Sequence, residues 1–246
     1  MKKRMLFYLI LMIMFNACST NDTAPQNAYR SRLQQLSKEE LNTQYLALRK
    51  RVNYSREQLL SRYKNGNKTK TLDDAKLYLM GVLSDSLFQY WYGTPWDFNG
   101  ITETPQDGKI ACGYFVTTTL LHSGFVLDRV TLAQQAASVI INTLCEEKKI
   151  KVFTNGNRSG LKEYLNKCDN SIFILGLDSH VGFVQKKDTS IVMIHSSGFS
   201  PWKVVNEPFD DCAAIQYSQF FMIGDLLGSK KSLLKWLGKE RFEMVN

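Results

Sequence analysis

A cysteine and two histidines carry most of the chemical information in this sequence. Cys112 lies in the stretch GKIACGYFVTTTLLHSGF (108–125), directly before an apolar run with helical spacing. A cysteine at the start of a helix lies near unpaired backbone N–H groups and the positive end of the helix dipole. Both favour the thiolate, and the N–H groups can also stabilise an oxyanion. Cys112 is therefore a candidate nucleophile for acyl transfer, and the alternative is an ordinary buried cysteine.

Two of the three histidines could supply the base that such a nucleophile needs. His180 begins the strand-like segment HVGFVQKK, and His195 lies near the end of the next one, SIVMIHSS. A two-residue turn at 187–188 would place His180 directly opposite His195 on one face of a hairpin. The third histidine, His122, would lie about 15 Å from Cys112 along the same helix. We therefore exclude it from the site and expect it at the surface or at the helix C-terminus.

These motifs, in this order, resemble the NlpC-type cell-wall cysteine peptidases of the papain-like superfamily. The resemblance spans about residues 93–205 and is carried by GTPWDFNG (93–100), ACGYF (111–115), HVGFV (180–184) and IHSSG (194–198). It implies that Cys112 is the nucleophile, that His180 is the base, and that His195 orients His180. The implied reaction is hydrolysis of an amide bond in the stem peptides of peptidoglycan, without a cofactor.

The resemblance also implies residues for the oxyanion site and the substrate. Trp96 stands where the family places an aromatic residue, and Gln106 resembles the oxyanion glutamine of papain, with a solvated loop residue as the alternative. Ala111 and Gly113 replace the Asp and Ser that flank the family's nucleophile. Because those two residues help to bind the free amino terminus of the substrate, their replacement leaves the catalytic elements but removes two groups that help to select the usual substrate.

Two other functions are compatible with these residues. The replaced flanking residues could mark the degenerate site of a non-catalytic lipoprotein that binds the cell wall. Alternatively, the thiol could serve a protease or acyltransferase that acts on another exported amide. A metal site is not expected, because no HxH, HExxH or CxxC spacing is present.

The N-terminal residues are typical of a bacterial lipoprotein. MKKR is basic, and the apolar run at 5–15 is too short to span a bilayer, so 1–17 reads as a signal peptide. FNACS resembles a lipobox with Cys18 as the lipidated residue, and a plain secretory signal is the alternative. Ser19 in place of Asp implies the outer membrane, facing the periplasm. The net charge of +8 comes without a nucleic-acid-binding motif. We therefore expect a monomer of the cell envelope that contacts the membrane only through its lipid and binds peptidoglycan stem peptides but no nucleic acid.

The elements that must position Cys112 and the histidines indicate an α+β fold. After a tether (18–28), helical patterns fill a region at 29–92, with capping signals at SKEE (37–40), SREQ (55–58) and TLDD (71–74). A long loop then leads to the nucleophile helix, and five strand-like segments follow within 172–223. We expect a papain-like domain at 93–227, in which this helix packs on an antiparallel sheet of about five strands, and a C-terminal helix within 228–246.

Overall fold

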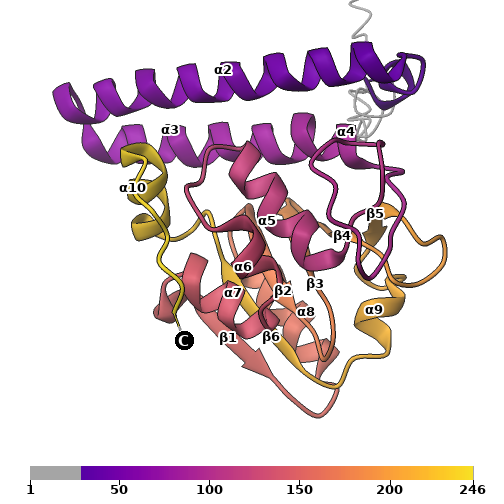
Figure 1. Ribbon diagram of the computed structural model, residues 1–246. Helices are drawn as coiled ribbons and strands as arrows, with labels where there is room; N and C mark the ends of the chain where they lie inside the picture. The colour runs from indigo at the N-terminus through magenta and orange to yellow at the C-terminus, as the bar shows by residue number, and fades with distance from the viewer. Residues whose placement is uncertain (1–28, 246) are drawn as a thin grey trace, which may run out of the picture.

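The centre of the molecule is one antiparallel sheet with the strand order β1-β6-β2-β3-β4-β5 (Figure 1). The computed structural model describes residues 29–245, so the predicted signal peptide, the tether and Cys18 lie outside the described residues. The strands are β1 (Ile150–Phe153), β2 (Ser171–Gly176), β3 (Val181–Lys187), β4 (Ser190–Ser196), β5 (Val204–Pro208) and β6 (Phe221–Asp225). The predicted α+β class is confirmed, with six strands in place of about five. The added strand β1 is half exposed and lacks the burial pattern that marks the others.

Helices cover both faces of this sheet. They are α2 (Lys38–Asn65), α3 (Lys68–Gly81), a π-helical turn η1 (Val82–Leu87), α4 (Phe88–Trp91), α5 (Cys112–His122), α6 (Arg129–Ala133), α7 (Ala137–Leu144), a 3-10 turn η2 (Glu147–Lys149), α8 (Arg158–Lys167), α9 (Ala213–Gln216) and α10 (Lys230–Gly238). Side chains alternate along β2, so Ile172 and Ile174 join the core under α5 and α7. Phe173 joins a second core with residues of α8 and α9.

The N-terminal helices form a layer outside α5 (Figure 1). Helix α2 begins at the SKEE signal, where Ser37 and Glu40 form the predicted capping box. The prediction of a second start at SREQ is wrong, because α2 continues through it and keeps Val52 and Leu59 buried on one face. Helix α3 likewise begins before TLDD, since the Asn67 side chain caps it at Lys70 N–H.

A buried polar chain joins this helical layer to α5. The indole N–H of Trp91 donates to the Tyr45 hydroxyl at 2.7 Å, and this hydroxyl lies 2.9 Å from His122 Nδ1. His122 is 2% exposed, so the expectation of a surface position is wrong. Burial and the nearby Arg49 and Arg129 lower the pKa of His122 to about 3, so its ring is neutral. Residues 29–92 therefore share one core with the helix that begins at Cys112.

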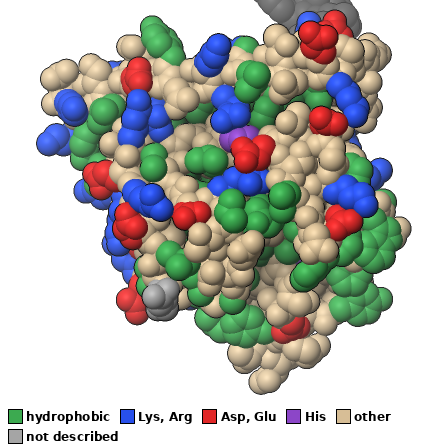
Figure 2. Space-filling model, viewed as in Figure 1, with side chains coloured by type: hydrophobic (Ala, Val, Ile, Leu, Met, Phe, Trp, Pro, Cys, Tyr) green, Lys and Arg blue, Asp and Glu red, His purple; other side chains and the backbone are tan. Residues whose placement is uncertain are grey.

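The remaining helices close the sheet and its edges. Helices α6 and α7 are separated by residues 134–136. The predicted C-terminal helix is confirmed as α10, which packs on the domain: Trp236 is fully buried, and its N–H donates to the Ser123 carbonyl at 2.8 Å. Within 29–245, none of the helices has both the length and the apolar character to cross a bilayer. On the face in Figure 2, Lys and Arg side chains alternate with acidic ones and form no continuous basic surface.

Candidate active site

Helix α5 places Cys112 at its first position. The preceding Ala111 has an extended backbone and no side-chain hydrogen bond to the helix, so the N–H groups of the first turn have no side-chain cap. Gly113 lies against α6, where an added Cβ would come within 2.2 Å of the Ala133 carbonyl oxygen. A serine would not fit there, so the glycine next to Cys112 follows from the close approach of α6.

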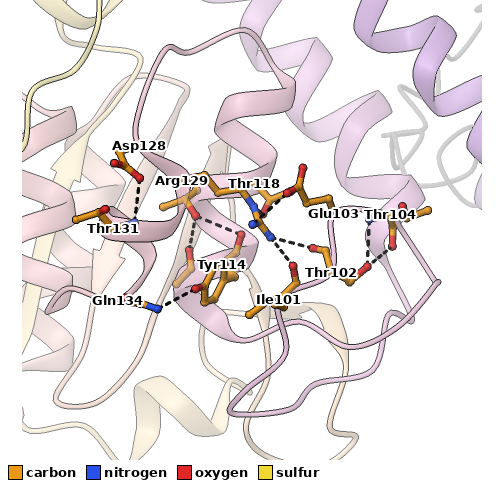
Figure 3. Close-up of polar contacts among 12 residues, drawn as sticks. Ile101, Thr102, Glu103, Thr104, Tyr114, Thr118, Asp128, Arg129, Thr131 and Gln134 are labelled. Atoms are coloured by element: carbon orange, nitrogen blue, oxygen red, sulfur yellow. Dashed lines mark hydrogen bonds and ion pairs between the residues drawn. The ribbon is translucent and has the colours of Figure 1, made fainter.

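Arg129 fixes the loop that precedes Cys112 (Figure 3). Its guanidinium is largely buried, and its Nε donates to Thr118 Oγ1 of α5 at 2.7 Å. Another of its nitrogens donates to the Ile101 carbonyl at 2.5 Å, and the group lies 4.9 Å from the centre of the Tyr114 ring. Ile101 forms a β-bridge with Ile110, two residues before Cys112. One arginine therefore ties the loop to α5 and α6, and no sequence motif marks this role.

His180 and His195 meet side by side, with His180 Nε2 2.7 Å from His195 Nδ1 and the rings edge to face. The hairpin register differs from the predicted one by two residues, because Lys187 pairs with Ser190 and the turn lies at 188–189. His180 directly precedes β3, and the register continues to place Gly182 opposite His195. A Cβ at Gly182 would lie 2.7 Å from the Cβ of His195, so the glycine of HVG makes room for the imidazole.

Glu207 of β5 completes this series, and the sequence analysis missed it. His195 Nε2 lies 2.7 Å from Glu207 Oε2, while the His195 side chain has no exposed surface. The hydrogen bond from His195 lowers the pKa of Glu207, so the carboxylate is ionised. The only signal in the sequence is a glutamate near the end of a strand-like segment. Its approach to His195 depends on the pairing of β5 with β4.

The hydrogen bonds from Glu207 through His195 to His180 determine the tautomer of each ring. A carboxylate can only accept, so His195 holds a proton on Nε2, and in its neutral form His195 presents a lone pair at Nδ1. That lone pair accepts from His180 Nε2–H, which leaves the lone pair of His180 on Nδ1. His180 thus has a free basic atom that is not engaged with His195. Its burial and the adjacent His195 lower the pKa of His180 to about 3, so the ring is neutral.

The Cys112 sulfur lies beside the same strand. The backbone N–H groups of Val181, which follows His180, of Gly113 and of Cys112 itself interact with the sulfur and lower its pKa. Burial outweighs them and raises the pKa of the thiol overall. The helix N-terminus favours the thiolate, as the sequence predicts, but this effect is smaller than that of burial. The thiol is therefore neutral, and formation of the thiolate requires a base.

Cys112 and His180 lie between two hollows of one cleft. The larger hollow, about 700 Å³, is largely apolar and includes Trp96, Phe98 and Phe199. The smaller, about 330 Å³, is lined on its polar side by Gln135, Ser138, Asp178 and Ser179. A chain-like substrate crossing the cysteine would therefore meet an aromatic surface on one side and polar groups on the other.

The two predicted oxyanion residues have different positions. Trp96 lines the larger hollow, packs on Trp202 and lies against Gly198. Gln106 is not among the residues that line either hollow, and its side-chain amide donates to the Tyr90 carbonyl at 3.0 Å. Its backbone N–H donates to Thr94, so Gln106 holds the loop together.

One cluster next to the histidines has metal-ligating chemistry. Donor atoms of His195, Glu207 and Cys212 all lie within 4.8 Å of one another. Cys212 Sγ is 3.8 Å from His195 Nε2 and is buried. The sequence predicts no metal, because these three residues follow no spacing motif. Cys112, Cys145, Cys168 and Cys212 are all free thiols.

Three comparisons with known proteins found no match for this chain. No protein-family model matches it, and neither the curated proteins nor the solved structures include a significant match. The functional argument therefore rests on the residues of the cleft.

Proposed function

We propose that this protein is a cysteine hydrolase that cleaves amide bonds by acyl transfer. The observation that carries the proposal is the hydrogen-bonded series from Glu207 through His195 to His180, which ends in the cleft that Cys112 also lines. A cysteine that only fills space in the core would need no hydrogen-bonded histidines and carboxylate near it. A nucleophile needs a base of defined tautomer, and this series supplies one.

The reaction follows from the tautomers. His180 Nδ1 takes the thiol proton as the Cys112 sulfur bonds to the carbonyl carbon of the substrate. The oxyanion forms near the uncapped N–H groups at the start of α5. His180 then gives the proton to the leaving amine, and a thioester remains on Cys112. Water attacks the thioester while His180 accepts its proton, and the carboxylic acid leaves as the thiol is restored.

The substrate class is the finer part of the proposal. The motif order at 93–205 favours a papain-like fold and a peptide stem of peptidoglycan as substrate. An amide in a muropeptide would have its glycan side on the exposed aromatic surface, where Phe98 and Phe199 offer flat apolar faces. The polar hollow would take the rest of the peptide. A lipid anchor on Cys18 in the outer membrane would bring the cleft to this substrate.

The test is incubation with purified muropeptides and mass spectrometry of the products. Cleavage at one amide is expected with the wild-type protein and none with Cys112→Ala. Cys168→Ala is the matched control, because Cys168 is also a partly exposed free thiol. Binding of muropeptides without cleavage would refute the hydrolase and favour a cell-wall-binding protein. Cleavage of other peptides or transfer to an added amine would identify a protease or an acyltransferase.

A further inference from the structure

We propose that His195, Glu207 and Cys212 form a binding site for a thiophilic divalent cation such as Zn²⁺, and that the bound ion switches off the base of the active site. The second half of this proposal rests on the proposed function; the first half does not. The site lies behind His195, on the side away from His180.

The donor atoms are close to the arrangement that zinc requires. A tetrahedral zinc ion with bonds of 2.0–2.3 Å separates its donors by about 3.3–3.7 Å. His195 Nε2 lies 3.8 Å from Cys212 Sγ and 2.7 Å from Glu207 Oε2. Side-chain shifts of less than about 1 Å would therefore admit the ion, with water as a fourth ligand.

Charge and access also fit such an ion. One thiolate and one carboxylate balance the two positive charges, so a filled site would be neutral in a region where His195 and Cys212 have no exposed surface. Glu207 is 23% exposed in its side chain and lies on β5, the edge strand of the sheet. An ion can therefore reach the site from this edge. Thiolate and imidazole together favour zinc over magnesium or calcium. The proposed hydrolysis makes no use of Cys212.

Binding would reverse both tautomers. The metal takes the lone pair of His195 Nε2, so the His195 proton must lie on Nδ1. His195 then donates to His180 Nε2, and His180 must carry its proton on Nδ1, where the Cys112 proton should go. The two rings together keep two protons, and the one proton released comes from the Cys212 thiol. With its basic atom already protonated, His180 cannot accept the thiol proton.

The binding test uses Co²⁺ as an optical probe for zinc. In Cys112→Ala, which lacks the nucleophile, Co²⁺ should bind with one ion per chain and give a thiolate-to-cobalt charge-transfer band that Zn²⁺ displaces. The band should vanish in Cys112→Ala/Cys212→Ser, with circular dichroism as the check of folding. If that double variant fails to fold, Cys112→Ala/Glu207→Gln should bind at least tenfold more weakly. A band that is absent from Cys112→Ala, or unchanged in the variants, would overturn the site.

The inhibition test separates this site from a metal on the catalytic pair. Zn²⁺ should inhibit muropeptide cleavage by the wild-type protein, a chelator should restore it, and Cys212→Ser should need at least tenfold more Zn²⁺. Equal inhibition of Cys212→Ser would mean that the ion acts at Cys112 and His180, and would overturn the switch. If the wild-type protein cleaves no muropeptide, the cobalt measurement still decides the metal site.

Discussion

Replacement of Glu207 by glutamine is expected to slow the proposed hydrolysis about tenfold while the protein stays folded. The carboxylate can only accept from His195 Nε2, and this fixes both imidazole tautomers. A glutamine amide can accept or donate, so it stabilises the productive and the reversed tautomers to similar degrees. A hydrogen bond to a charged group contributes about 1.5–3 kcal/mol and a neutral one about 0.5–1.5 kcal/mol. The difference of about 1.4 kcal/mol corresponds to a factor of ten in rate.

Glu207→Leu should have a larger effect. It removes the acceptor at 2.7 Å and leaves the Nε2–H of a fully buried histidine with only the weakly accepting sulfur of Cys212, at 3.8 Å. Such a loss costs about 1–3 kcal/mol of stability. With no group to set the tautomer, kcat/KM should fall about a hundredfold. Glu163→Gln is the matched control, because that carboxylate pairs with Lys167 on the exposed surface of α8. It should leave the rate unchanged.

Two measurements check this reasoning, both with a chelator present so that metal cannot contribute. The first is kcat/KM for a muropeptide with each variant. The second is the nitrogen NMR spectrum of the labelled imidazoles, which reports the protonated nitrogen of His180 and His195. Wild-type protein should carry both protons on Nε2, and Glu207→Leu should show a mixture. Unchanged tautomers together with an unchanged kcat/KM in Glu207→Leu would refute the role of the carboxylate.

Two further predictions concern stability. Gly113→Ala should lower the free energy of unfolding by about 1–3 kcal/mol, because its Cβ would lie 2.2 Å from the Ala133 carbonyl oxygen. Gly81→Ala is the control, because the nearest atom to its added Cβ would be 3.9 Å away; it should be neutral or stabilise by up to about 1 kcal/mol. Urea unfolding measures the free energy of unfolding of both variants. Equal changes in the two variants would contradict the steric argument. The protein should also lose stability as the pH falls from about 6.5 toward 3, because burial holds the folded pKa of His122 at about 3, and the unfolded chain takes up the proton first. His122→Asn should reduce the slope of the unfolding free energy against pH by up to about 1.4 kcal/mol per pH unit. His180 contributes to the same slope, so part of it should remain in the variant. An identical slope in the variant would disprove the low pKa of His122.

The sequence by itself determined the local features of the site. The apolar run after Cys112 predicted helix α5, and Ser123 and Gly124 directly follow the observed helix, since helix starts and ends depend on neighbouring residues. Strand alternation put His180 and His195 on one face. The actual register differs by two residues, and a shift of two preserves the face because side chains alternate with a period of two. The prediction that the two histidines share one face is therefore correct, although the predicted turn is wrong.

Only the tertiary structure decided what surrounds these residues. Glu207 and Cys212 reach His195 because β5 pairs with β4 and the chain then turns back, and no periodicity encodes that pairing. Arg129 fixes the loop before Cys112 through carbonyl groups, which carry no side-chain identity that a sequence could show. The sign of the Cys112 pKa shift also needed the structure. The helix terminus is visible in the sequence, but the burial that outweighs it depends on every segment packed around the sulfur.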